Sequence, residues 1–218
     1  MSITILITSG PTREYIDPVR FISNASSGKM GKALAIEALQ QGCNVIVIKG
    51  PSDINIQKNK KCKVIDVVSA KDMLAAVKKN LKFADIFIGA AAVSDYRSVN
   101  IAKNKIKKKD IDTDTINLKL IKNPDIIKYV GQHKNKKVVV GFALETQNLL
   151  SYAKTKLKEK NLDMIIANGA TTISSKNSAP TIIFKNGKIK KVKLTSKENV
   201  AKEIINESIG IYKTIKTC

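Results

Sequence analysis

The fold is decided near the start of the chain by Ile3-Thr4-Ile5-Leu6-Ile7, by a loop that ends in Ser26-Ser27-Gly28-Lys29-Met30-Gly31, and by residues 32–39. The first run predicts a buried strand, and residues 32–39 predict a helix. A strand, a polar loop and a helix with glycine at its start form the arrangement with which α/β proteins bind phosphate. Backbone N–H groups and the helix dipole favour an anion there. Ser27 and Gly28 are therefore predicted to border a nucleotide site.

The loop between this strand and helix is unusually long and carries two of the three arginines of the chain. These two are Arg13 and Arg20, and the third is Arg97. All other members of the 39 Lys and Arg residues are lysines. In a composition that drifts toward lysine, we expect arginine to remain where its planar, bidentate fork is needed for carboxylate or phosphate.

Short apolar runs alternate with helical patterns along the rest of the chain. We predict strands over residues 3–7, 44–48, 63–67, 85–89, 116–120, 138–142, 163–167, 181–184 and 189–194. We predict helices over residues 31–41, 70–81, 124–130, 148–160 and 198–215. The alternation indicates an α/β fold with a doubly wound, mostly parallel Rossmann-like sheet, followed by a C-terminal hairpin and helix at about residues 180–216. Asn186-Gly187 predicts a type I′ turn in that hairpin. The length fits a single domain, 1–218.

The composition argues against a nucleic-acid-binding protein, although the formal net charge is +21. The lysines are spread over the whole chain, tryptophan is absent and aromatic residues make up 5%. We therefore expect a solvated lysine-rich surface, and no nucleic-acid partner. The alternative predicts tight binding to DNA or RNA that weakens steeply with salt.

Cysteine and histidine usage argues against a zinc site and a histidine-based triad. Cys43, Cys62 and Cys218 have no metal-ligand spacing, and the single histidine, His133, lies in a polar run. The apolar runs are too short to span a membrane and no signal peptide opens the chain, so we expect a cytoplasmic protein without a membrane partner.

Motifs of two other nucleotide-binding classes are present only in part. Tyr152 and Lys156 match the Tyr-x-x-x-Lys pair of short-chain dehydrogenases, so an NAD(P)-linked oxidoreductase is an alternative. The glycine fingerprint of that class is missing after the first strand, where Ser9-Gly10-Pro11-Thr12-Arg13 stands. The segment Ser26-Ser27-Gly28-Lys29 fails as a P-loop, because Met30 stands where Ser or Thr is required.

A second candidate segment follows the predicted strand 85–89. Gly89, Ala90 and Ala91 are small, and small residues at the carboxyl end of a strand let a ligand approach the backbone closely. Asp95 could accept a hydrogen bond from an amine such as the exocyclic group of a base. The alternative for Asp95 is a helix cap or an ion pair with Arg97.

Two groups of lysines could contact phosphate. Lys105-Ile106-Lys107-Lys108 lies in a polar segment that we expect to form a flap over about residues 98–115, and such a flap could close over a triphosphate. Lys156 and Lys160 share one face of a predicted helix and could form a phosphate clamp. The alternative for both groups is a solvated surface.

Taken together, these segments resemble the phosphopantothenoylcysteine synthetase family, in its bacterial CTP-dependent type. They run in family order over about residues 3–170, and the tail beyond matches only loosely. The matching segments are Gly10-Pro11-Thr12-Arg13, Asp17-Pro18-Val19-Arg20-Phe21-Ile22-Ser23-Asn24, Ser26-Ser27-Gly28-Lys29-Met30-Gly31, Ala91-Ala92-Val93-Ser94-Asp95-Tyr96-Arg97, Lys105-Ile106-Lys107-Lys108, Lys122-Asn123-Pro124-Asp125-Ile126, Val140-Gly141-Phe142-Ala143-Leu144-Glu145-Thr146 and Leu162-Asp163-Met164-Ile165-Ile166-Ala167-Asn168.

The resemblance implies a ligase of coenzyme A biosynthesis that uses CTP as a substrate together with Mg²⁺. The carboxylate of 4′-phosphopantothenate would attack the α-phosphate of CTP, giving an acyl-cytidylate and pyrophosphate. The amine of cysteine would then displace CMP and form the amide of 4′-phosphopantothenoylcysteine. Electrostatic stabilisation does most of the work in such a reaction, and no histidine is needed.

The resemblance also implies roles for individual residues. Asn24 would bind the activated carbonyl and support the second step, Arg20 would position the same group, and Lys105 would close on the triphosphate. Asp95 would read the cytosine amine. The nucleotide pocket would be formed by Ala91, Asp95, Pro124, Asp125, Ile126, Ile127, Phe142, Lys156 and Lys160. No metal ligand is identified.

Family members are dimers whose site is completed across the interface, so the resemblance implies a homodimer. Many bacterial members are fused to a flavin-dependent phosphopantothenoylcysteine decarboxylase. This chain starts almost directly at the first synthetase strand. We therefore expect either a stand-alone enzyme or a separated half that associates with such a decarboxylase.

Overall fold

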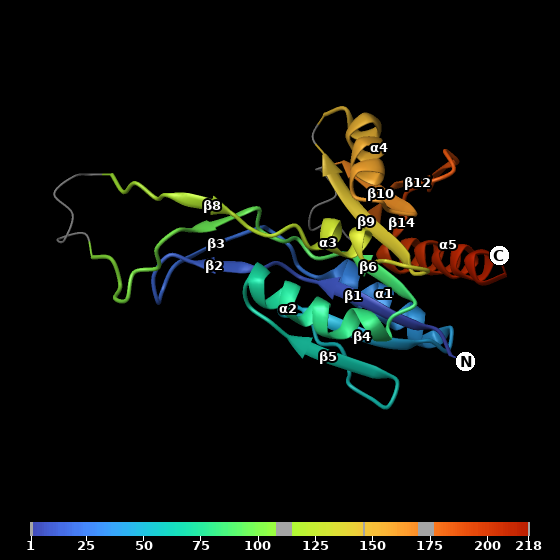
Figure 1. Cartoon of the computed structure of the whole chain (residues 1–218), viewed down its shortest axis with the longest axis horizontal. Coiled ribbons are helices and arrows are strands. Elements are labelled where there is room, and N and C mark those ends of the chain that lie inside the picture. The colour runs from blue at the N-terminus through green and yellow to red at the C-terminus, as the bar shows by residue number, and fades with distance from the viewer. Residues whose placement is uncertain (1, 108–114, 146, 170–176, 218) are drawn as a thin grey trace.

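A sheet of eight strands forms the centre of the computed structural model, which describes residues 2–107, 115–145, 147–169 and 177–217. The strands are β1 (Thr4–Ser9), β4 (Asn44–Lys49), β5 (Cys62–Asp66), β6 (Ile86–Gly89), β9 (Val138–Glu145), β10 (Met164–Gly169), β12 (Thr181–Phe184) and β13 (Ile189–Lys191). Their order is β13-β12-β10-β9-β6-β1-β4-β5 (Figure 1). Every pairing from β5 through to β10 is parallel, and β12 and β13 are antiparallel. The predicted α/β Rossmann-like fold with a C-terminal hairpin and helix is confirmed.

Helices cover both faces of the sheet. They are α1 (Lys29–Gln40), α2 (Ala70–Asn80), the 3₁₀ turn η1 (Leu81–Phe83), α3 (Ile126–Gln132), α4 (Leu149–Glu159) and α5 (Lys197–Thr217). The buried side chains of α1 and α5 pack on one face with Ile5 and Ile7 of β1. Those of α2, α3 and α4 pack on the other face with Leu6. Successive side chains of a strand point to opposite faces, so the continuous apolar run of β1 serves both cores.

Four short strands form an extension that we call the arm (Figure 1, left). They are β2 (Arg13–Tyr15), β3 (Phe21–Ser23), β7 (Tyr96–Ser98) and β8 (Leu120–Lys122), paired as β2–β3 and β7–β8. A further small pair joins β11 (Asn177–Ser178) to β14 (Thr195–Ser196). None of these strands except part of β8 was predicted, because runs of two or three residues are too short to show a period.

The loop before α1 brings the start of that helix close to the end of β1. Gly28 precedes α1 at a φ of 73°, a left-handed conformation that glycine adopts without steric cost. A Cβ atom on Gly31 would lie 2.1 Å from Ser9 Oγ, so only glycine permits this close approach. The predicted strand, loop and helix therefore form one compact unit at the carboxyl edge of the sheet.

Two local predictions between residues 115 and 132 were wrong. Residues 115–119 are not a strand, although their polar and apolar residues alternate; only β8 pairs with a partner there. The helix predicted from residue 124 begins at Ile126, and its cap is Asp125, whose side chain accepts from Lys128 N.

The C-terminal hairpin is present, but its turn is not type I′. A type I′ turn needs a positive φ at both central residues, and Asn186 is not among the described non-glycine residues with positive φ. Gly187 has a φ of 88°, its N–H donates to Phe184 O, and Phe184 N–H donates to Lys188 O. These bonds define a three-residue loop with a left-handed glycine.

Within the described ranges, none of the helices is both long enough and apolar enough to cross a lipid bilayer.

Candidate functional site

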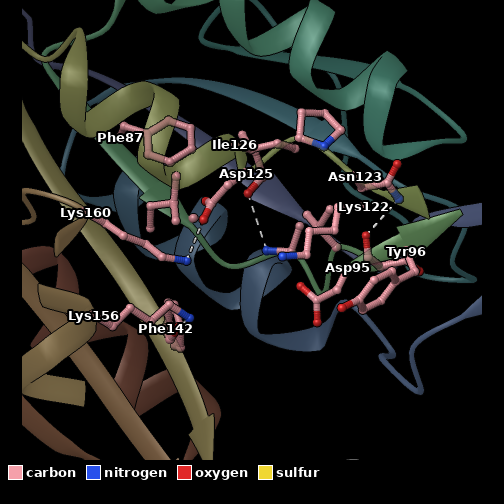
Figure 2. A pocket seen from close by; sticks show the side chains of 17 residues that line it. Phe87, Asp95, Tyr96, Lys122, Asn123, Asp125, Ile126, Phe142, Lys156 and Lys160 are labelled. Carbon is pink, nitrogen blue, oxygen red and sulfur yellow. Dashed lines mark hydrogen bonds and ion pairs between the residues drawn. The ribbon is translucent and has the colours of Figure 1, made fainter. Parts of the chain in front are cut away.

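A cavity of about 440 Å³ opens at the carboxyl edge of the sheet, beside the point where the strand order reverses between β1 and β6 (Figure 2). Ligands of open α/β sheets bind at this topological switch point. The predicted residues that line it are Gly89, Ala91, Asp95, Pro124, Asp125, Ile126, Ile127, Phe142, Lys156 and Lys160. The structure thus brings together small residues after β6, the start of α3, one residue of β9 and two lysines of the α4 region.

Both lysines are held in place by contacts with the cavity wall. Lys160 Nζ forms an ion pair with Asp125 Oδ2 at 2.8 Å, and Lys156 Nζ donates to Phe142 O at 2.7 Å. Figure 2 shows Lys160 reaching toward Asp125 across the cavity. The two lysines therefore share one face of the helix region, as their spacing predicts.

Asp125 carries a negative charge under ordinary conditions. Burial by itself raises the pKa of this carboxyl group, but the hydrogen bonds from Lys160 and from Lys128 N–H, with the positive charges of Lys160 and Lys156, outweigh that effect. The pKa of Asp125 consequently lies below its usual value. The cavity therefore combines two cations with an ionised carboxylate, and has net positive charge at that end.

The backbone on both sides of Asp95 is fixed by Asn123. Asn123 Nδ2 donates to Ser94 O at 2.9 Å, and Asn123 N donates to Asp95 O at 2.7 Å. Arg97 donates to Lys122 O at 2.6 Å and to Asn123 Oδ1 at 3.2 Å. In the part of the chain that the structure describes, Asp95 forms no ion pair with Arg97, so its carboxylate can accept from a ligand in the cavity.

The other predicted residues of the first loop lie beside this cavity rather than in it. Ser27, Gly28 and Ala90 line a smaller cavity of about 160 Å³ at the start of α1. Asn24 lines a third cavity of about 500 Å³, and its Nδ2 donates to Ala92 O at 3.3 Å and to Val93 O at 3.0 Å. Asn24 therefore stands between the third cavity and the segment after β6.

Arg20 and Lys105 line none of these three cavities. Arg20 pairs with Asp17, with 2.7 Å between Arg20 Nη2 and Asp17 Oδ2, and the same Nη2 donates to Ile106 O. Asp17 Oδ2 also accepts from Ile106 N at 3.2 Å. The pair therefore holds the residue next to Lys105, whose own side chain is exposed.

Asp17 was not predicted as part of this arrangement, although Asp-Pro is typical of a turn. Its fully buried carboxylate also accepts from Val19 N at 2.8 Å and from Arg20 N at 2.7 Å. Burial alone raises the pKa of Asp17, but these hydrogen bonds and those from the Arg20 side chain and Ile106 N outweigh it and hold the pKa far below its usual value. The contact with Ile106 spans 89 residues of sequence.

Some predicted residues lie outside the described ranges. They are Lys108 with the part of the expected flap over residues 108–114, and Thr146 of the segment 140–146.

Seven residues line the cavity at the switch point without having been predicted there. They are Thr8, Phe87, Val93, Ser94, Tyr96, Lys122 and Asn123. A signal existed for most of them, because they adjoin the ends of β1 and β6 or the Pro124 segment. Tyr152 is 51% exposed and lies outside the cavity that Lys156 lines, so the dehydrogenase-like pair does not converge there. The described residues contain no cluster of three His, Cys, Asp or Glu side chains placed to hold a metal.

Comparison with known proteins gives a consistent result. Residues 1–211 match the family described as "DNA/pantothenate metabolism flavoprotein C-terminal domain". The "Coenzyme A biosynthesis bifunctional protein CoaBC" of Haemophilus influenzae is 48% identical over 214 residues, which cover 96% of this chain and 52% of that protein. The chain thus spans about half the length of the curated relatives it matches.

Two solved structures are similar over almost the whole chain. The crystal structure of the C-terminal domain of Coenzyme A biosynthesis bifunctional protein CoaBC has a TM-score of 0.81 at 38% identity, covering 99% of this chain and 97% of that one. The DNA/pantothenate metabolism flavoprotein from Streptococcus pneumoniae has a TM-score of 0.83 at 28% identity, covering 97% of this chain and 100% of that one.

Proposed function

This chain belongs to the DNA/pantothenate metabolism flavoprotein C-terminal domain family, and from that membership we propose that it is a CTP-dependent phosphopantothenate–cysteine ligase of coenzyme A biosynthesis. The observation that carries the proposal is the cavity at the switch point. Nine residues that the family resemblance assigns to the nucleotide come from separate segments and line it together. Its volume of about 440 Å³ lies within the range typical of small-molecule sites.

In the first step, a carboxylate oxygen of 4′-phosphopantothenate forms a bond to the α-phosphorus of CTP, and the bond from that phosphorus to pyrophosphate breaks. Asp95 accepts from the cytosine amino group, while Lys156 and Lys160 attract the phosphates. Mg²⁺ enters as the magnesium complex of CTP, since Mg²⁺ is usually held by substrate phosphates with few protein carboxylates. Lys105 adds positive charge from the flap, which lowers the barrier because the reaction concentrates negative charge on the phosphates.

In the second step, the cysteine nitrogen forms a bond to the acyl carbon, and the bond from that carbon to the phosphate oxygen of CMP breaks. The nitrogen loses a proton to solvent. The Asn24 amide exchanges its longer hydrogen bond, to Ala92 O, for one to the acyl oxygen and stabilises the developing negative charge of that oxygen. Arg20 positions the same group, and its bonds to Asp17 and Ile106 couple that role to the flap.

We also propose that the active form is a homodimer. Six apolar side chains of the arm and its flanks are each 41–62% exposed: Val99, Ile101, Ile116, Leu118, Leu120 and Ile121. Exposed apolar side chains that gather in one part of a fold are typical of a protein–protein interface. Light scattering after size exclusion tests this, with a mass of two chains expected. Because the named relatives are bifunctional, a flavin-dependent decarboxylase is the partner we propose for the next reaction, on the same polypeptide or a separate one.

Mass spectrometry of the products tests the ligase directly. The purified protein is mixed with 4′-phosphopantothenate, cysteine and Mg²⁺, with CTP in one sample and ATP in another. We expect 4′-phosphopantothenoylcysteine and CMP in the CTP sample. If product forms only in the ATP sample, the base contact assigned to Asp95 is contradicted. If product forms in neither sample, the ligase proposal is contradicted. Asp95→Asn, which keeps the size of the side chain, should reduce the preference for CTP over ATP.

A further inference from the structure

The side chain of Arg13 differs from those of the other two arginines in having no polar partner among the described residues. The side chain of Arg20 pairs with Asp17, and that of Arg97 donates to Lys122 O and Asn123 Oδ1. The Arg13 guanidinium lies over the Phe21 ring, 4.5 Å from its centroid. Across the described residues it takes part in no hydrogen bond and no ion pair, so its five N–H donors are open to a ligand.

The β2–β3 hairpin fixes the direction of Arg13. Arg13 pairs with Ser23, and Phe21 lies two residues before Ser23, so these three side chains share one face of the hairpin. Glu14 points to the opposite face, where it is buried and accepts from Ala70 N at 2.8 Å. Ser23 Oγ donates to Thr12 O at 2.8 Å, which holds the two strands together. The guanidinium is therefore pre-organised rather than free to move with solvent.

Arg13 faces the third cavity, of about 500 Å³, together with Phe21 and Ser23. Lys29 is the second cation in its lining, and Asp53 is its one acidic residue. Arginine presents a planar fork that matches a carboxylate, and a carboxylate such as Asp53 attracts an ammonium group. The same Asp53 would repel a phosphate. Arg13 and Asp53 thus give this cavity the pair of opposite charges that a zwitterion requires, and Lys29 adds further positive charge.

Asn24 connects the third cavity to the cavity at the switch point, which we call the nucleotide cavity. It lines the former, and its side chain donates to Val93 O, at a residue that lines the latter. An amine held beside Asn24 would therefore lie next to the segment after β6 that borders the nucleotide cavity.

We propose that the third cavity binds the amino-acid acceptor of the reaction as a zwitterion, with Arg13 recognising the α-carboxylate of cysteine and Asp53 its ammonium group before it deprotonates. The inference rests on the proposed ligase function. Arg13 is a specificity-determining residue in this account: it orients the acceptor and takes no part in activating 4′-phosphopantothenate.

Cysteamine provides the decisive probe, because it is cysteine without the carboxylate. In Arg13→Gln, kcat/KM for cysteine should fall roughly 10- to 100-fold, the loss typical of a charge-assisted bidentate contact. The kcat/KM for cysteamine should stay within about twofold, since cysteamine makes no such contact. Arg13→Lys should recover part of the loss with cysteine, because lysine restores the charge but not the fork.

Lys188→Gln is the matched control. Lys188 also stacks on an aromatic ring, with Nζ 5.5 Å from the Phe184 centroid, but it lies on the C-terminal hairpin. The Lys188→Gln substitution removes the same charge and the same kind of ring contact as Arg13→Gln. It should leave kcat/KM unchanged for both cysteine and cysteamine. Unchanged hydrogen exchange at the Ala70 amide, which donates to Glu14 of β2, shows that the hairpin still folds in Arg13→Gln. Arg13→Lys keeps the test valid if Arg13→Gln is unstable.

Pyrophosphate release in a single turnover without cysteine separates this inference from the ligase proposal. Its absence from the wild-type protein overturns both. If the wild type releases pyrophosphate, the inference is overturned by an unchanged preference for cysteine over cysteamine in Arg13→Gln. It is also overturned by a raised KM for 4′-phosphopantothenate with an unchanged KM for cysteine, which would identify the anion at Arg13 as the substrate phosphate.

Discussion

The wall of the nucleotide cavity and the arm are stabilised by different interactions. The wall grows directly from buried elements: Phe87 of β6 is fully buried, and Ile126 of α3 is 5% exposed. The described residues of the arm form no comparable core, and several of its apolar side chains are exposed. Its geometry depends on single polar contacts such as Glu14 with Ala70 N and Asp17 with Ile106 N.

This difference predicts where substitutions change stability and where they change only chemistry. A buried wall is shared by many side chains, so a packing error there lowers the free energy of unfolding of the whole sheet. A loop held by a few polar contacts can be released locally while the sheet stays folded. Substitutions in the sheet and in the arm test that contrast.

Gly31→Val should have the largest effect, because even its Cβ would lie 2.1 Å from Ser9 Oγ and 3.1 Å from Ser9 Cα. Overpacking at this helix–strand contact should lower the free energy of unfolding by roughly 3 kcal/mol. Urea denaturation measures the change. Gly210→Ala is the control, since nothing lies within 4 Å of a Cβ there, and it should be neutral or stabilising by up to about 1 kcal/mol. Equal losses in both variants would contradict the close approach of α1 to β1.

Asp17→Asn should release the flap while leaving the sheet folded. Hydrogen exchange at the Ile106 amide should accelerate, because the amide loses its charged acceptor, while amides of β1 and β6 keep their protection. The melting temperature should fall by less than in Gly31→Val. If Ile106 and the central strands lose protection together, the arm is not an independent unit.

Acidification of the wild type tests the same contact. The pKa of Asp17 in the folded state lies below its value of about 3.9 in the unfolded state. The contribution of Asp17 to stability is therefore complete above about pH 3.9, and it is lost as the pH falls through the lower folded-state pKa. Protection of the Ile106 amide, corrected for intrinsic exchange, should therefore persist from pH 7 to about pH 4. Loss of protection above pH 5 would contradict the lowered pKa.

Lys160→Met should weaken CTP binding far more than it destabilises the fold. The Lys160–Asp125 ion pair is partly exposed, so its loss should cost about 1 kcal/mol or less. Loss of a phosphate-binding cation should raise the KM for CTP roughly tenfold or more. Lys158→Met, on the exposed side of α4, is the control and should leave KM unchanged. A similar KM increase in both variants would indicate a general effect of surface charge.

The elements of the sheet were predictable because burial leaves a pattern in the sequence. The apolar run at β1 and the Lys156/Lys160 spacing each specify a local geometry, and the crossover order of a doubly wound sheet then places their ends together. The Asp125–Lys160 pair was not predictable, because the two residues lie on different elements. The charge of a side chain does not by itself show which oppositely charged residue it will contact.

The arm was predicted poorly for a related reason. Polar and apolar residues alternate over residues 116–120 as in a strand, yet only Leu120 of that run belongs to β8. Alternation predicts which face of a segment is apolar, but it does not show whether a partner strand is present. The position of Lys105 depends on the bonds from Asp17 and Arg20 to Ile106, a contact between distant segments with no periodic signal.

Lys105→Ala should have the smallest effect on stability and separates chemistry from folding most clearly. The side chain is exposed, and Lys105 is not one of the residues that hold the flap to Asp17. The free energy of unfolding should change by less than about 0.5 kcal/mol. Pyrophosphate release in the first step should nevertheless slow at least roughly tenfold, because a cation that stabilises the charged transition state is removed. Lys103→Ala, an exposed lysine of the same segment, is the control and should leave that step unchanged. A stability loss without a slower first step would make Lys105 a structural residue of the arm.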